Sequence, residues 1–102
     1  MRWIKVAKVS DLEDGKAVMV PLSGGQAALF RVDGKFYAIE NRCGHRGGPL
    51  ADGHCEKGIV TCPWHAWTFD VRTGACQNAP GLDQKTFQVK VEKDEVFLSD
   101  AS

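Results

Sequence analysis

The stretch CPWHAWTFDVRTG, residues 62–74, places Cys62 and His65 three positions apart, with a proline and a tryptophan between them. A second pair, Cys43 and His45, stands upstream in RCGHRGG. Cysteine thiolates and neutral imidazoles both bind zinc and iron well. Because a tight loop turns both side chains of a pair to one side, each pair can reach a single site. The pattern C-x-H, sixteen residues, C-x-x-H therefore supplies four candidate metal ligands.

The region around these pairs has an unusual composition. Residues 41–80 hold six of the eleven glycines, all four cysteines and all three histidines. Glycine-rich loops lose much backbone entropy on folding, and a bound metal centre would offset that cost by cross-linking them. In the chain-entropy model, closing a loop of roughly twenty residues contributes about 3 kcal/mol. We expect one domain, residues 1–102, with a loop-rich metal-binding subdomain over approximately 41–80.

Outside this region the apolar residues recur with a period of two, which predicts an all-β fold built as an antiparallel sandwich or barrel. The run AVMVPL, residues 17–22, predicts a short buried strand, and Pro21 predicts that its end lies at a sheet edge or a turn. Asp33-Gly34 between two β-prone runs predicts a hairpin. Gly74 predicts a turn with positive φ, and Lys93-Asp94 predicts a turn between the last two strands.

Two shorter predictions concern the N-terminal part. Ile4, Val6 and Val9 are spaced like a first strand. The segment SDLEDGK predicts one helical turn, with Ser10 as N-cap and Glu13 at the capping-box position.

Charge and hydropathy exclude several classes of function. The 13 basic and 13 acidic residues cancel, which argues against nucleic acid as the main partner, because phosphate binding needs a clustered basic face. The N-terminus does not look like a secretory signal, and no apolar run is long enough to span a membrane. We expect a cytoplasmic protein, whose four cysteines are metal ligands or free thiols. Cys55 and Cys76 are expected to be small buried residues, with a disulfide between them as the alternative.

Two kinds of metal centre fit the four ligands. One is a structural zinc ion in a closed Cys₂His₂ tetrahedron. The other is a [2Fe–2S] cluster, with two thiolates on one iron and two imidazoles on the other. Each loop supplies one cysteine and one histidine, whereas the common zinc finger pairs its cysteines in one knuckle. The ligand count alone leaves both open.

At this point the chain resembles the Rieske iron–sulfur family. The resemblance rests on CGH, RGGPLADG, GIVTCPWH and FDVRTG, and it covers nearly the whole chain. It implies the Rieske fold, with a β base and a small cluster-binding subdomain. It implies one [2Fe–2S] cluster with Cys43 and Cys62 on the inner iron, and His45 and His65 on the outer iron near the surface. The implied function is one-electron transfer.

The residues also resemble one branch of that family. High-potential members carry two extra cysteines and a serine, at positions that are Gly48, Trp64 and Trp67 here. Fewer hydrogen bonds to sulfide leave a reduced cluster less stabilised, which predicts a low potential. The chain is thus similar to Rieske-type ferredoxins. These are electron carriers rather than enzymes, and they link a flavin-containing NAD(P)H reductase to a terminal oxygenase such as an aromatic-ring dioxygenase. The alternative is the small subunit of NAD(P)H nitrite reductase.

Five further residues have expected roles beside the cluster. Trp64 and Trp67 are expected to shield it from water. Pro80 resembles a residue of the family's proline-containing loop over the cluster, with an ordinary turn as the alternative. Arg42 and Arg46 bracket the first ligand pair and suggest docking of an acidic partner surface, although solvated surface charge is the usual role of an arginine.

Overall fold

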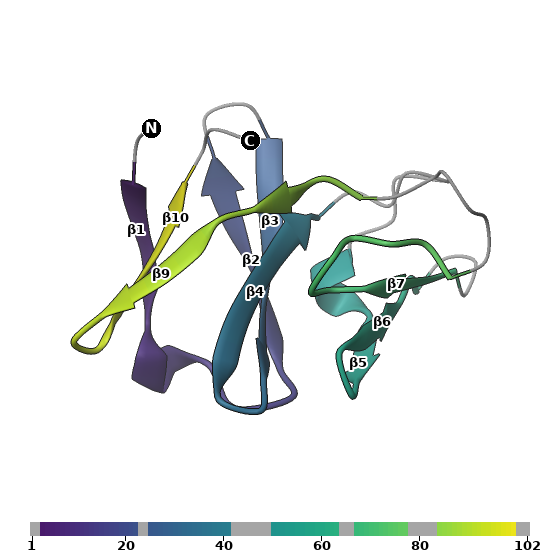
Figure 1. Cartoon of the computed structure of the whole chain (residues 1–102), viewed down its shortest axis with the longest axis horizontal. Coiled ribbons are helices and arrows are strands. Elements are labelled where there is room, and N and C mark those ends of the chain that lie inside the picture. Colours follow the sequence, from purple (N-terminus) through teal and green to yellow (C-terminus); the bar gives the residue numbers. More distant parts are fainter. Residues whose placement is uncertain (1–2, 23–24, 42–49, 64–66, 78–83, 100–102) are drawn as a thin grey trace.

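The computed structural model describes residues 3–22, 25–41, 50–63, 67–77 and 84–99. These residues form three antiparallel sheets and two single-turn 3₁₀ helices (Figure 1). The outer sheet contains β1 (Trp3–Lys8), β10 (Glu95–Ser99) and β9 (Val89–Glu92). The central sheet contains β2 (Ala17–Leu22), β3 (Gly25–Val32), β4 (Lys35–Glu40) and β8 (Thr86–Phe87). The small sheet contains β5 (His54–Glu56), β6 (Ile59–Thr61) and β7 (Thr68–Asp70).

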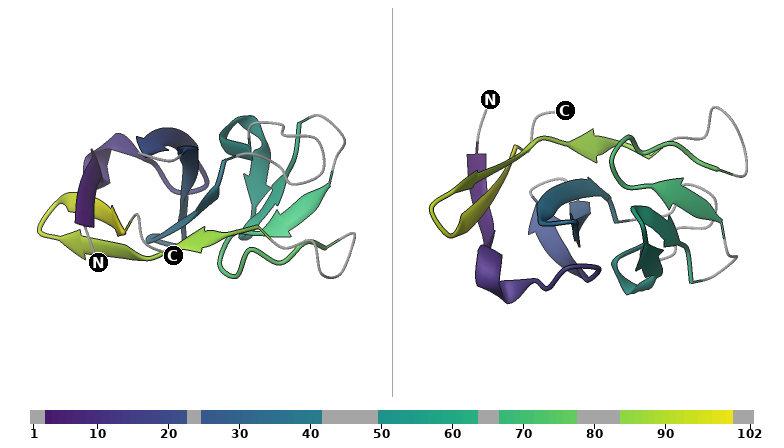
Figure 2. Two further views of the ribbon diagram at one scale, coloured as in Figure 1. Left: turned by 90° about the horizontal axis from the view of Figure 1, so that it is seen from above. Right: turned by 60° about the horizontal axis from the view of Figure 1, so that its bottom comes forward.

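The central sheet lies between the other two sheets, as the views in Figure 2 show. Its two faces bury two separate apolar cores. We call the first the base core, which lies against the outer sheet and comprises Leu12, Val20, Ala27, Leu29, Phe36, Ala38, Val96 and Leu98. We call the second the lobe core, which comprises Ala28, Phe30, Val32, Ile39, Leu50, Val60, Cys62, Phe69, Val71 and Cys76. The prediction of an all-β, antiparallel fold is confirmed.

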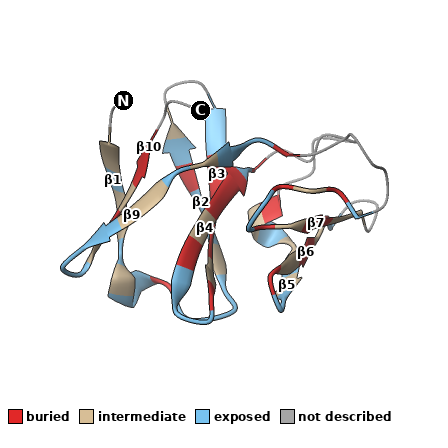
Figure 3. Ribbon diagram, in the orientation of Figure 1, coloured by how far each residue is buried: buried red, intermediate tan, exposed pale blue. Residues whose placement is uncertain are grey.

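Residues 27–30 of β3 form a continuous apolar run because both faces of the strand are buried there. Side chains alternate between the two faces of a strand. Ala27 and Leu29 therefore enter the base core, while Ala28 and Phe30 enter the lobe core. All four are fully buried, which gives the buried middle of the central sheet in Figure 3. The strand between two cores has no solvent face, so it has no polar alternation.

The prediction that residues 17–22 form a strand is confirmed, but the prediction that this strand is buried was wrong. Among the described strands, β2 pairs only with β3 and lies at the edge of the central sheet, as expected from Pro21. Val18 is 40% exposed and Met19 is 42% exposed. An edge strand is covered from one side only, so an apolar run there stays half open to solvent.

The predicted turns occur where glycine or a polar residue takes a left-handed conformation. Asp33 and Gly34 have φ of 51° and 80° between β3 and β4, Gly74 has φ of 81°, and Lys93 has φ of 58° between β9 and β10. These values confirm the hairpin at Asp33-Gly34, the positive φ at Gly74 and the turn at Lys93-Asp94.

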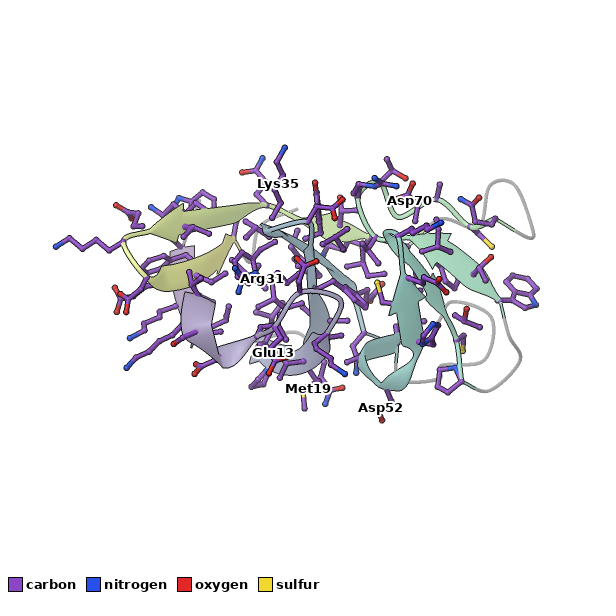
Figure 4. The ribbon with its side chains drawn as sticks, turned by 90° about the horizontal axis from the view of Figure 1, so that it is seen from below. Glu13, Met19, Arg31, Lys35, Asp52 and Asp70 are labelled. Atoms are coloured by element: carbon purple, nitrogen blue, oxygen red, sulfur yellow. The ribbon has the colours of Figure 1, made fainter. Side chains whose placement is uncertain are left out.

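The helical turn near the N-terminus begins earlier than predicted. η1 spans Val9–Asp11, and the Lys8 N–H donates to the Asp11 carboxylate over 3.0 Å, so Ser10 is not the N-cap. The cause is a tertiary contact. The Val9 N–H donates to the Asp94 carbonyl over 2.7 Å, and the Arg31 guanidinium donates to the Val9 carbonyl over 3.2 Å. Figure 4 shows Arg31 between η1 and the central sheet.

Residues 86–92 belong to two sheets in succession. β8 pairs with β4 in the central sheet, and β9 then pairs with β10 in the outer sheet. This segment ties the two sheets of the base together. In the described part of the chain, no helix is long and apolar enough to cross a membrane. The small sheet falls within residues 41–80, but the proposed domain and subdomain boundaries stay a prediction.

Candidate metal centre

Of the four predicted ligands, the structure describes Cys62. The other three, Cys43, His45 and His65, lie outside the described residues, as do Arg42, Arg46, Gly48, Trp64 and Pro80. The structure does describe the residues on either side of each of these segments. It therefore shows how the fold anchors the loops that carry the predicted ligands.

Cys62 follows directly after β6 and is 1% exposed. Its N–H donates to the Trp67 carbonyl over 2.7 Å, next to the paired residues Thr61 and Thr68. This bond extends the pairing of β6 and β7 by one residue on each strand. The end of β6 therefore holds one predicted ligand, and His65 follows it in the sequence before β7 begins.

The surroundings of Cys62 are apolar. Cys62 belongs to the lobe core together with Leu50, Val60 and Phe69, and the partly buried Trp67 packs against that core. The shielding role expected for Trp67 agrees with this packing. An apolar environment excludes water and strengthens the electrostatic interactions of any charge held there. A thiolate at Cys62 would need a metal partner to be stable in such a place.

Asn41 and Leu50 hold the two ends of the segment that carries Cys43 and His45. The Leu50 N–H donates to the Asn41 carbonyl over 2.7 Å. Leu50 is fully buried and starts η2 (Leu50–Asp52). The two described residues that flank segment 42–49 in the sequence are therefore bonded to each other.

The two ligand-bearing segments start side by side. Gly53 ends the η2 turn, where its N–H donates to the Leu50 carbonyl over 3.0 Å. A Cβ at Gly53 would overlap the Thr61 carbonyl, so only glycine permits this approach. Thr61 immediately precedes Cys62. The η2 turn, which follows segment 42–49, is thereby packed against the residue that precedes Cys62.

The segment that contains Pro80 is anchored on the same lobe. The Gln77 N–H donates to the Thr68 carbonyl over 2.8 Å, and the Gln84 N–H donates to the Gly74 carbonyl over 2.7 Å. A Cβ at Gly74 would overlap the Gln84 carbonyl. Gly74 is therefore required both by its positive φ and by this close approach.

Sequence reasoning missed the anchoring residues Asn41, Gly53 and Gln84. Asn41 stands two residues before Cys43, and a polar residue between an apolar strand and a ligand was a usable signal. Gly53 was counted among the loop glycines without a role. Gln84 carries no local signal, because its partners come from distant segments.

Cys55 and Cys76 lie at opposite edges of the small sheet. Cys55 pairs with Val60, Val60 pairs with Phe69, and Phe69 forms a bridge with Cys76. Three strand spacings separate the two cysteines by about 14 Å, which excludes a disulfide. Cys76 is buried in the lobe core and Cys55 is partly buried against it, as expected for small apolar residues.

Burial raises the pKa of the Cys55 thiol, and a hydrogen bond with the Gly58 backbone offsets part of that rise. Cys55 also lines a pocket of about 320 Å³ together with Asp14, Asp33, Lys57 and Arg72. Cys62, the predicted ligand that the structure describes, is not among the described residues that line this pocket. His54, the histidine outside the motif, is exposed and lies on β5.

Cys62, the one proposed ligand that the structure describes, fits the role of a cluster thiolate. Cys62 offers a water-shielded thiol, and the ends of the second ligand loop are adjacent to it through Gly53. Within the described ranges, no group of three or more histidine, cysteine, aspartate or glutamate residues could hold a metal elsewhere.

Comparison with known proteins identifies the family. The model of the Rieske [2Fe-2S] domain matches residues 2–94. The chain is 42% identical over 94 residues to apoptosis-inducing factor 3 of Homo sapiens, covering 91% of this chain and 16% of that protein. It is 35% identical to the ferredoxin component of the naphthalene 1,2-dioxygenase system of Pseudomonas putida, covering 96% of this chain and 95% of that protein.

Solved structures agree with this match. A structure described as a complex of reduced oxygenase and oxidised ferredoxin of carbazole 1,9a-dioxygenase contains a chain with a TM-score of 0.89 and 31% identity. The alignment covers 95% of this chain and 92% of that one. The β fold, the cysteine and histidine pattern and the family match agree, and this chain belongs to the family of Rieske [2Fe–2S] domains.

Proposed function

We propose that this chain is a one-electron carrier between a flavin-containing NAD(P)H reductase and a terminal oxygenase, such as an aromatic-ring dioxygenase. One observation carries the proposal. The chain and the naphthalene dioxygenase ferredoxin component match over nearly the full length of both. The carbazole dioxygenase structure supports the oxygenase as the second partner, because there a ferredoxin is seen in complex with an oxygenase.

Within this proposal the cluster ligands are Cys43, His45, Cys62 and His65. The cysteines hold the inner iron and the histidines hold the outer iron. The packing of Gly53 against Thr61 supports this set, because it brings the turn that follows the first ligand segment next to the residue that precedes Cys62. When bound, the cluster supplies a site that accepts and releases one electron.

The protein's own contribution is to bind, shield and present the cluster. The lobe core around Cys62 excludes water from the inner side. Cys43 and His45 belong to segment 42–49, while Cys62 and His65 lie between β6 and β7 in the sequence. The proposed ligands are therefore held in two separate segments of the chain. No substrate is transformed in this role, so we classify the chain as a carrier, and we place it in the cytoplasm with its partners.

The alternative is the small subunit of NAD(P)H nitrite reductase. A structure described as such a subunit from Mycobacterium tuberculosis has a TM-score of 0.89 at 23% identity, which supports a common fold alone. This chain spans 16% of apoptosis-inducing factor 3, so that match concerns one domain of a longer protein. A large reductase chain that stays bound through purification would favour the alternative.

We further propose a low reduction potential. Gly48 and Trp64 stand where high-potential members have cysteines, and Trp67 stands where they have a serine. Rieske centres span about −150 to +300 mV, and we expect a midpoint in the lower half of that range. A redox titration followed by visible absorbance measures it. A midpoint near the upper end would contradict this proposal.

The first test is the visible and low-temperature EPR spectrum of the purified protein before and after dithionite. We expect a brown protein that bleaches and then gives a rhombic signal with a low average g value. Iron and sulfide should both be present at two per chain. A colourless protein with one tightly bound zinc would reject the electron-carrier proposal and make the same four residues a structural site.

A further inference from the structure

Asn41 is a buried polar residue at the end of β4, two positions before Cys43. It is 4% exposed. Its N–H donates to the Gln26 carbonyl over 3.0 Å, and its carbonyl accepts the Leu50 N–H over 2.7 Å. Both polar atoms of its side chain are also hydrogen-bonded. The amide oxygen accepts the Ala51 N–H over 2.8 Å, and the amide nitrogen donates to the Gln26 side chain over 3.1 Å.

These bonds join three parts of the chain at one residue. Gln26 belongs to β3 of the central sheet, while Leu50 and Ala51 form the first turn of η2. Asn41 therefore holds β3 and η2 together, directly before segment 42–49 in the sequence. The main-chain bond to Leu50 would form with any residue at this position. The bond to Ala51 needs a side-chain acceptor of the length of asparagine.

The same corner anchors the segment that contains Pro80. The Glu40 carbonyl accepts the Gln84 side-chain amide over 3.2 Å, and the Glu40 N–H donates to the Lys85 carbonyl over 2.9 Å. Residues 40 and 41 thus hold the ends of two loops. We expect a substitution at Asn41 to disturb the structure around η2 and the ligand segments, and to change the packing of the base core far less.

We propose that Asn41 is a positioning residue for the cluster. Its side-chain bond to Ala51 fixes η2 against the end of β4, and in this role it orients the proposed ligands Cys43 and His45, which lie between these two elements in the sequence. The proposal rests on the ligand set given above. Asn41 acts through the loop, because its four polar groups are already bonded to protein. Residues outside the ligand set that orient ligands typically change metal affinity by about 10- to 100-fold when replaced.

The test compares two replacements of Asn41 in the cluster-loaded protein. Asn41→Leu keeps the approximate size and removes the acceptor. Asn41→Asp keeps an acceptor for the Ala51 N–H. We expect Asn41→Leu to release iron to a ferrous chelator about 10-fold faster than wild type, and to broaden the EPR signal of the reduced cluster. The rate of iron release from Asn41→Asp should stay within about 3-fold of the wild-type rate. That change is smaller than the effect of losing a residue that orients metal ligands.

The matched control is Asp14→Ala. The Asp14 carboxylate accepts the Gly34 N–H over 2.7 Å at the hairpin of β3 and β4, so it is also a side-chain acceptor for one backbone N–H. Urea unfolding of each variant measures its stability. We expect Asp14→Ala to lower stability and leave iron release and the EPR signal unchanged. Equal iron release in Asn41→Leu and wild type would overturn the proposal. The proposal would also be overturned if Asn41→Leu and Asp14→Ala both released iron faster in proportion to their loss of stability in urea.

Two further outcomes keep the test decisive. If Asn41→Leu does not fold, Asn41→Gln replaces it, because its longer side chain moves the acceptor away from the Ala51 N–H. Fast iron release from Asn41→Gln supports the proposal and wild-type release overturns it. If the wild-type protein holds zinc instead of iron and sulfide, the proposed function fails. The release of zinc from the same variants then still tests the positioning role of Asn41.

Discussion

The base core and the lobe core share β3 and β4 but are completed in different ways. The base core is closed by the outer sheet, whose strands have four to six residues. The lobe core is closed by η2 and the small sheet, in which each strand has three residues. Strands this short carry few ladder hydrogen bonds and bury few side chains. The lobe therefore needs other means of holding its loops.

Those means are single residues with specific partners. Gly53 allows the η2 turn to approach Thr61, and Gly74 allows close contact with the Gln84 carbonyl. Asn41 closes segment 42–49 with hydrogen bonds. The base core depends on the summed burial of apolar area, which tolerates small errors. The lobe depends on a few exact fits and, in the proposed function, on the cluster that cross-links its loops.

The largest effect should come from removing Cys62. We expect Cys62→Ser to lose the visible spectrum of the cluster completely. Amide hydrogen exchange should accelerate in the small sheet and stay slow in β3 and β10, because the base core does not include the cluster loops. Cys76→Ser is the control, since Cys76 is also a buried cysteine of the lobe core and is not a predicted ligand. Slow exchange in the small sheet of cluster-free Cys62→Ser would show that the lobe is stable by itself.

The next effect compares neighbouring residues that face different cores. Leu29→Ala opens a cavity in the base core and should cost about 2–5 kcal/mol. Phe30→Ala opens one in the lobe core and should cost about 3–5 kcal/mol. Urea unfolding measures both. We expect only Phe30→Ala to accelerate iron release, because only that side chain packs on the Cys62 side. Equal acceleration in the two variants would mean that the cores are not independent.

A smaller effect separates backbone strain from close packing. Gly34 and Gly74 have nearly the same φ, 80° and 81°, but an added Cβ would meet another segment only at Gly74. Gly34→Ala should lower stability by about 1–2 kcal/mol through left-handed strain alone. Gly74→Ala should cost about 1–3 kcal/mol more, because the Gln84 carbonyl must move. Thermal unfolding of the two variants gives the difference. No difference would mean that the segment after Gly74 moves away freely.

The smallest effect concerns pH. Burial raises the pKa of the Cys55 thiol above its ordinary value of 9.0. The unfolded thiol then ionises first, so the unfolded chain binds fewer protons and stability falls as the pH rises above about 9. Below that pH the contribution is fully present. We expect Cys55→Ala to show a shallower loss of stability than wild type from pH 8 to pH 11. Parallel curves would show that Cys55 does not contribute.

The elements that could be predicted from the sequence depend on local patterns. Alternation gave the strands, and Asp33-Gly34, Gly74 and Lys93-Asp94 gave their turns, because a left-handed residue marks its own position. The spacing of cysteine and histidine gave the candidate ligands and the family. The positions of Cys43, His45 and His65 around a cluster stay a proposal.

The elements that could not be predicted depend on which strands become neighbours. An apolar run such as residues 17–22 looks alike in a buried strand and in an edge strand, so the exposure of Val18 and Met19 was not foreseen. η1 was misplaced because Asp94 binds the Val9 N–H from the far end of the chain. Asn41 and Gln84 act through partners from other elements, which no local pattern contains.

The pairing of β1 with β10 has a consequence for synthesis on the ribosome. Trp3 lies opposite Ser99, so the outer sheet joins residues from the two ends of the described chain. Contacts this distant in sequence close late, because a long loop must be ordered first. The small sheet pairs residues within 54–70 and can form as soon as those residues emerge. The nascent chain can thus form the small sheet before β10 has been synthesised and can pair with β1.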